Sequence, residues 1–117
     1  MSSSLVILVL TALIGVNSLA GEPSTSIERG RYLLRITGCN DCHTPMYGPR
    51  NGDVPDKDWL TGVPVGWKGP WGTTYATNLR QRVAQMSEEQ WVSYAKSLKS
   101  RPPMPYFALN EMQERDL

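Results

Sequence analysis

The first apolar stretch of the chain is an uncharged run at residues 5–16, LVILVLTALIGV. Small residues follow at Ser18 and Ala20, and the first charged residue is Glu22. A short apolar core ahead of small residues is typical of a secretory signal peptide, and this run is shorter than the roughly 20 residues of a spanning helix. We therefore expect a signal peptide at residues 1–20 and a single domain at 21–117. An uncleaved anchor or a buried helix are the other interpretations of the run.

Two capping boxes mark the starts of amphipathic helices. Thr25-Ser26-Ile27-Glu28 predicts a helix that continues through Ile36 and stops at Gly38. Ser87-Glu88-Glu89-Gln90 predicts a second helix, which ends near Ser100. Its apolar residues recur at the spacing of one helix face. They are Trp91, Tyr94, Ala95 and Leu98. A short helix at 107–112 and the first turn of another at 113–117 are also expected.

The segment between these helices has a different character. From Pro45 to Gly72 it holds five prolines and six glycines in 28 residues. That density disfavours any helix or long strand, so we expect an extended loop there. The expected fold class is therefore all-α, small and rich in loops. Three of the four tryptophans, Trp59, Trp67 and Trp71, lie in this loop, and such side chains need a large apolar surface to pack on.

Composition narrows the possible functions. Twelve Lys and Arg against eleven Asp and Glu give a net charge of +1, so the chain lacks the basic excess of a nucleic-acid binder. Two cysteines and one histidine cannot complete a four-ligand zinc site within one chain. A loop-rich domain of this size buries little apolar surface and usually needs a disulfide, a metal or a cofactor for stability.

The candidate for that role is the sequence Cys39-Asn40-Asp41-Cys42-His43. In a C-x-x-C-H motif each thiol can form a thioether with one haem vinyl group, and the adjacent histidine can ligate the iron. The motif uses every Cys and His of the chain and follows a predicted export signal. We therefore expect one covalent haem c, held by Cys39 and Cys42, with His43 on the iron.

Three other uses of the cysteines are open. A thioredoxin-like dithiol needs a βαβ context, and no strand pattern is visible in the sequence. A structural disulfide between Cys39 and Cys42 would leave His43 without a role. A zinc site completed by a second chain would need ligands from that chain.

The sixth ligand of the iron cannot be a second histidine, because His43 is the only one. Methionine is favoured for a c-type electron carrier. We assign Met104, which lies between Pro103 and Pro105, since the prolines stiffen the backbone that carries its sulfur. Met112 is the alternative. Met46 is too close to His43, and Met86 lies next to a helix N-cap.

The chain resembles the class I cytochrome c family. More narrowly, it is similar to the cytochrome c subunits of bacterial membrane-bound alcohol and sugar dehydrogenases and to small single-haem relatives. The stretches that carry the resemblance are Arg29–Leu33, Cys39–Pro45, Gly72–Leu79, Ser87–Trp91 and Pro103–Tyr106. The resemblance implies a cytochrome c fold around one haem, bound by Cys39 and Cys42, with His43 and Met104 on the iron.

The chain departs from the family pattern at its end. In the family an Asp-Leu sequence opens a final helix, which crosses the first helix at a glycine that corresponds to Gly30. Here the sequence ends at Asp116-Leu117. We therefore expect a truncated C-terminal helix, and a surface beside Gly30 that lacks its partner.

Together these features predict a periplasmic one-electron carrier and not an enzyme. Its expected partners are redox proteins, namely a dehydrogenase, a terminal oxidase or both, and association with a membrane complex is possible. Two alternatives are open. One is an electron-transfer subunit or fragment of a membrane-bound dehydrogenase. The other is a haem sensor or enzyme with a labile sixth ligand.

Overall fold

The computed structural model describes residues 25–117, so the expected signal peptide at residues 1–20 lies outside the described residues. Helix α1 spans Ser26–Ile36, and the hydroxyl of its N-cap Thr25 accepts a hydrogen bond from the backbone N–H of Glu28 at 3.1 Å. Helix α2, Cys39–His43, follows after Gly38, whose φ of +74° is readily adopted only by glycine. The first predicted helix is thus confirmed in both position and start signal.

The second predicted helix is also confirmed. Helix α4 spans Glu88–Ser97, and Ser87 and Gln90 form the reciprocal capping box. The helix ends at Ser97, three residues before the expected end. The side-chain amide of Asn110 donates to the carbonyls of Ala95, at 2.7 Å, and Leu98, at 3.3 Å. Because Asn110 belongs to helix α5, Tyr106–Glu111, these bonds join the end of α4 to its neighbour.

The remaining helical elements are short. They are the 3₁₀ turn η1 at Asp56–Asp58, helix α3 at Leu79–Val83, and the 3₁₀ turn η2 at Glu114–Asp116. The last of these replaces the expected first turn of a helix at 113–117. Residues 25–117 therefore form a small, mostly helical domain with five α-helices and one β-hairpin.

The hairpin corrects the all-α prediction. Strands β1, Val63–Gly69, and β2, Gly72–Ala76, pair antiparallel across a two-residue turn. The prolines and glycines that indicated a loop occupy positions that a hairpin tolerates. Pro64 lies where the register is shifted between Val63 and Gly66, so its missing N–H costs no regular ladder bond. A Cβ at Gly66 would lie 2.7 Å from Cγ2 of Thr73, so a side chain does not fit there.

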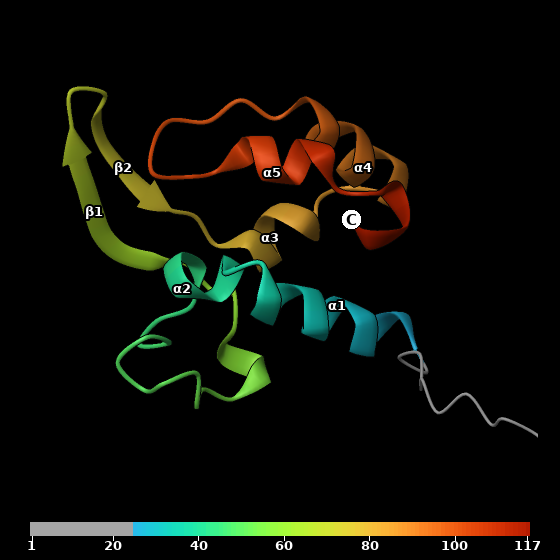
Figure 1. Ribbon diagram of the computed structural model, residues 1–117, viewed down its shortest axis with the longest axis horizontal. Coiled ribbons are helices and arrows are strands. Elements are labelled where there is room, and N and C mark those ends of the chain that lie inside the picture. Colours follow the sequence, from blue (N-terminus) through green and yellow to red (C-terminus); the bar gives the residue numbers. More distant parts are fainter. Residues whose placement is uncertain (1–24) are drawn as a thin grey trace, which may run out of the picture.

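The helices are arranged in two layers with the hairpin at one end. In Figure 1, α1 and α2 run along one side of the molecule, α4 and α5 along the other, and the hairpin stands at one end. The C-terminal turn joins the two layers. Arg29 of α1 forms an ion pair with Asp116 at 3.0 Å, and the indole N–H of Trp91 on α4 donates to the carbonyl of Leu117.

Little of the apolar surface in the described part of the chain is buried. Its buried apolar residues are Val54, Trp59 and Ala95. Trp59 packs inside the 45–60 loop, where its indole N–H donates to Val54 O at 2.8 Å and Arg35 lies over its ring at 5.1 Å. Apart from Arg29, Arg31 and the helix's own nearby backbone, no atom of residues 25–117 lies within 4 Å of where a Cβ of Gly30 would be. The surface beside Gly30 is therefore open.

Candidate functional site

Helix α2 is held by a small polar network at its buried side. The hydroxyl of Thr44 donates to Oδ1 of Asn40 at 2.7 Å and accepts from the backbone N–H of Leu60 at 2.9 Å. Asn40 and Thr44 are almost completely buried. A buried hydroxyl that both donates and accepts fixes the groups on either side of it. The network therefore sets the orientation of α2 against the loop that returns at Leu60.

The His43 ring has a defined orientation and tautomer. It is 8% exposed, and its Nδ1 lies 2.8 Å from the backbone carbonyl of Thr77. Because a carbonyl only accepts, Nδ1 carries the proton and donates, which leaves the lone pair on Nε2. An imidazole held in this way presents Nε2 as a metal ligand.

Gly62 forms a hydrogen bond that holds the backbone of His43. Its N–H donates to the carbonyl of His43 at 2.8 Å. Its φ is +85°, and an added Cβ would lie 2.9 Å from the backbone N of Asn78. A side chain at this position would be both strained and crowded. The glycine thus lets the 60–62 and 77–79 segments meet directly behind the motif.

Both cysteines are free thiols of intermediate burial. Sγ of Cys39 lies 3.2 Å from the hydroxyl of Thr37. Burial raises the pKa of Cys42, and the nearby charges of Asp41 and Cys39 raise it further. The Cys42 thiol is therefore protonated at neutral pH. The two thiols are not joined as a disulfide and remain available for another covalent partner.

The four predicted site residues border one cavity of about 280 Å³. Cys39, Cys42 and His43 form its floor at α2, and Met104 reaches it from the loop between α4 and α5. This volume is close to the lower end of the range for small-molecule sites, about 300–1,000 Å³. Most of the lining is apolar or aromatic.

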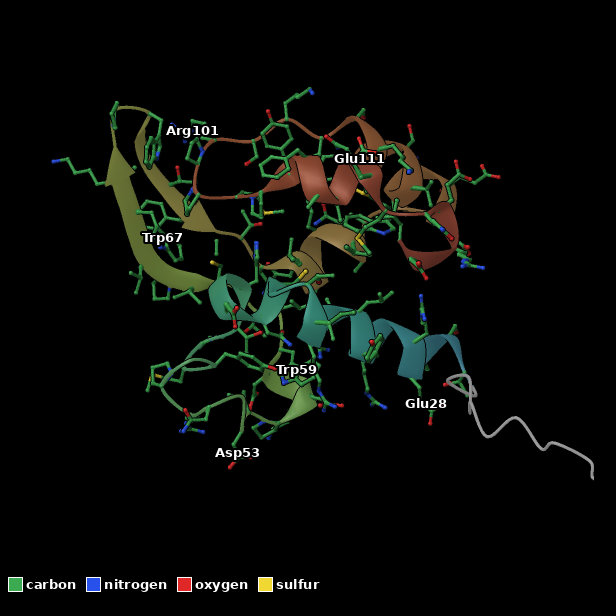
Figure 2. All side chains as sticks on the ribbon, viewed as in Figure 1. Glu28, Asp53, Trp59, Trp67, Arg101 and Glu111 are labelled. Carbon is green, nitrogen blue, oxygen red and sulfur yellow. The ribbon has the colours of Figure 1, made fainter. Side chains whose placement is uncertain are left out.

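Some lining residues follow from the sequence patterns and others do not. Trp91, Tyr94 and Leu98, three members of the predicted apolar face of α4, turn toward the cavity. Trp67 lines it as well, whereas Trp59 does not. In Figure 2, Trp67 lies on the hairpin and Trp59 lies beneath α1. Of the three loop tryptophans, Trp67 alone borders the cavity, whereas Trp59 packs inside its own loop and Trp71 is 37% exposed.

Two residues that sequence reasoning did not select also belong to the site. Thr77 supplies the carbonyl for His43. Thr74 borders the cavity, while its hydroxyl oxygen is buried and has no hydrogen-bond partner among residues 25–117. Both lie in the Gly72–Leu79 stretch that resembles the cytochromes. That resemblance pointed to the segment without indicating which of its atoms contact the site.

The other methionines differ in their placement. Met112 lines the cavity, as Met104 does. Met46 is 56% exposed and Met86 is partly buried, and neither borders the cavity. Geometry thus leaves Met104 and Met112 as the two sulfur candidates, the same pair that the sequence left.

Haem c fits the donor set of this cavity. Two free thiols, an imidazole with a free Nε2 and a thioether border one apolar space. Within the described chain no cluster of three or more His, Cys, Asp or Glu side chains could hold a metal ion alone.

Comparisons with protein-family models, with curated proteins and with solved structures found no match. None of the helices in residues 25–117 has the length and hydrophobicity required to span a bilayer.

Proposed function

We propose that this chain is a periplasmic c-type cytochrome that carries one electron at a time on a single covalent haem. The observation that carries the proposal is the meeting of both free thiols, the oriented His43 and the thioether of Met104 at one apolar cavity. The C-x-x-C-H motif and the predicted signal peptide at residues 1–20 support it, because c-type haem is attached outside the cytoplasm.

On this proposal each residue has a distinct task. Cys39 and Cys42 would hold the haem through thioethers, and His43 and Met104 would ligate its iron. The haem supplies an iron that changes between Fe(II) and Fe(III). The chain orients the imidazole through Thr77 and surrounds the site with apolar side chains, which exclude water and thereby favour the less charged reduced state. If His43 and Met104 both ligate the iron, the iron would have no place for a substrate, and the chain would act as a carrier and not as an enzyme.

The dithiol alternative receives less support. Thioredoxin-like redox motifs belong to a βαβ unit, whereas the described residues pair two antiparallel strands only. The partners that fit the carrier function are redox proteins, with a dehydrogenase as donor and a terminal oxidase as acceptor.

One observation favours a second candidate, an electron-transfer subunit bound within a membrane dehydrogenase complex. Helix α1 exposes three large apolar side chains, Ile27, Tyr32 and Ile36, by 66%, 50% and 60%. Ile27 lies three positions before Gly30 and so on the same side of α1, and Ile27 together with the open surface beside Gly30 suits a protein contact. Co-purification of a dehydrogenase with the tagged chain from its native membranes would support this candidate, and recovery as a free monomer would oppose it.

The proposal is tested by expressing the chain with a c-type maturation system. We expect a pyridine-haem spectrum typical of thioether-linked haem under denaturing conditions, with one haem per chain by intact mass. Cys39→Ala combined with Cys42→Ala should abolish the covalent haem, whereas Met104→Ala should retain it. A wild-type chain that matures without covalent haem, while a known cytochrome matures in the same cells, would refute the proposal.

A further inference from the structure

The side chain of Arg80 joins helix α3 to the turn at residues 56–59. Its Nε donates to the backbone carbonyl of Trp59 at 2.6 Å, and a terminal nitrogen of the same guanidinium donates to the carbonyl of Asp56. Trp59 is buried, so its carbonyl needs a donor from the protein. A planar guanidinium that bonds two acceptors at once holds both in a fixed position relative to α3.

The chain that follows this turn is bonded to both α2 and α3. The N–H of Leu60 donates to the hydroxyl of Thr44, directly after α2, at 2.9 Å. The carbonyl of Leu60 accepts from the N–H of Leu79, the first residue of α3, at 2.9 Å. Two residues later, the N–H of Gly62 donates to the carbonyl of His43 at 2.8 Å. The segment therefore connects the end of α2 to the start of α3.

The start of α3 carries the group that orients His43. The carbonyl of Thr77, which lies 2.8 Å from Nδ1 of His43, directly precedes Asn78, the N-cap of α3. The Asn78 side chain bonds the first turn of the helix to itself, so it does not fix where that turn lies. The backbone bonds to the carbonyl of Leu60 and the two side-chain bonds of Arg80 hold the turn against the neighbouring segment.

Resting on the proposed function, we infer that Arg80 is a positioning residue, which holds the Thr77 carbonyl against the Nδ1–H of His43 and thereby tunes the reduction potential. A bond from Nδ1–H to a carbonyl makes the imidazole a more basic ligand, and a more basic ligand favours Fe(III). Arg80 does not border the cavity and acts only through the position of α3. A displaced carbonyl weakens the bond, so loss of the Arg80 contacts raises the midpoint potential.

The direct observable is the Nδ1 proton of His43. In the reduced, haem-bearing protein, nuclear magnetic resonance measures its chemical shift relative to the carbon-bound protons of the same ring, which feel the haem but make no such bond. Arg80→Gln should move the Nδ1 resonance upfield, as expected for a weaker hydrogen bond. Arg80→Lys keeps the charge but lacks the planar fork that bonds two carbonyls, so it should move the resonance the same way and raise the midpoint potential.

Lys57→Gln is the matched control. It removes a positive charge from an exposed position of the same turn and leaves the Arg80 side chain intact. It should keep the wild-type shift of the Nδ1 proton. An upfield move in Lys57→Gln as large as that in Arg80→Gln would overturn the inference, because loss of charge alone would then explain the result. A general loss of stability does not change the shift of the native state, so the measurement separates positioning from stabilisation.

The outcomes also separate this inference from the proposed function. Wild-type protein without covalent haem would overturn both. Covalent haem in all the proteins, with the wild-type Nδ1 shift in both Arg80 variants, would overturn the role of Arg80 alone. An unchanged midpoint potential in Arg80→Lys would do the same. If Arg80→Gln fails to accumulate with haem, Arg80→Lys is the milder change and decides the question by the same two measurements.

Discussion

At the scale of single residues, a few polar contacts decide what the cavity can bind. The Thr77 carbonyl fixes the proton on Nδ1 of His43, and Thr44 links Asn40 to the backbone of Leu60. These bonds are short and largely shielded from water. Removing one partner of such a bond therefore leaves a shielded polar group unpaired, which lowers the free energy of unfolding.

The axial assignment gives the first prediction. Met104→Ala should leave the haem attached, because attachment needs only the two cysteines. Without the thioether, the ferric iron should change from low spin toward high spin, the midpoint potential should fall, and the reduced iron should bind carbon monoxide. Optical spectra and potentiometric titration measure these effects.

Met112→Ala is the matched control, since Met112 lines the same cavity. It should lose packing only and keep the low-spin spectrum and the potential. The assignment of Met104 is rejected if Met104→Ala keeps the wild-type spectrum and potential while Met112→Ala changes both. Carbon monoxide binding by the wild type without denaturant would instead favour the sensor or enzyme alternative.

The polar network gives a second prediction. Thr44→Val should lower the free energy of unfolding by about 1–3 kcal/mol, because Oδ1 of Asn40 and the N–H of Leu60 both lose their partner in a buried place. Denaturant unfolding followed by circular dichroism measures the change. Thr61→Val is the control, since its hydroxyl donates to Asp58 O at an exposed position. Equal losses in the two variants would contradict the assigned role of Thr44.

At the scale of elements, the site depends on how short segments meet. The 60–62 segment contacts α2 through Gly62 and the start of α3 through the Leu60 carbonyl, which accepts from the N–H of Leu79 at 2.9 Å. Helices α4 and α5 pack on each other, joined by Asn110 and by Lys96, whose ammonium donates to the carbonyls of Asn110 and Met112. These junctions hold the histidine and methionine walls of the cavity.

The Gly62 junction gives a third prediction. Gly62→Ala should destabilise the protein by at least ~1–2 kcal/mol, because an L-residue at a φ of +85° is strained and its Cβ would crowd the backbone of Asn78. Thermal unfolding of the ferric protein measures the loss. Gly48→Ala is the matched control, since nothing lies within 4 Å of its Cβ position and its φ is not positive. A midpoint for Gly62→Ala as high as that of Gly48→Ala would show that the junction is not tight.

At the scale of the whole molecule, the described residues line a cavity but form only a small hydrophobic core. Val54, Trp59 and Ala95 are its buried apolar residues, and the layers of α1–α2 and α4–α5 face each other across the cavity. The C-terminal turn ties the layers at one place, through Arg29 and Asp116. Because so little apolar surface is buried in a domain of this size, we expect its stability to depend on what fills the cavity.

That dependence gives a fourth prediction. The chain carrying Cys39→Ala and Cys42→Ala, purified without haem, should retain partial helix content but show little protection in amide hydrogen exchange. The haem-bearing wild type should show strong protection in α2, α4 and α5. The physical reason is that the apolar cavity walls gain partner atoms only from the ligand. Protection in the haem-free chain comparable to the wild type would mean that the protein closes its core unaided.

The sequence by itself determined the elements whose signals are local. The caps at Thr25 and Ser87 fixed the starts of α1 and α4, since a side chain that bonds the backbone three residues later needs no tertiary partner. The C-x-x-C-H motif was equally readable, because its residues are consecutive. The sequence placed it at the end of the first helix, and the structure gives it a separate short helix, α2.

Only the tertiary structure decided the contacts between distant positions. Strands β1 and β2 pair with each other and tolerate Pro64 and Gly66, because the register is irregular there. From composition alone, the same residues indicated a loop. The tautomer of His43 depends on a carbonyl 34 positions away, and the unpaired hydroxyl of Thr74 is defined by what surrounds it. Such features depend on which backbone atoms the folded chain brings within bonding distance, and no spacing along the sequence encodes that distance.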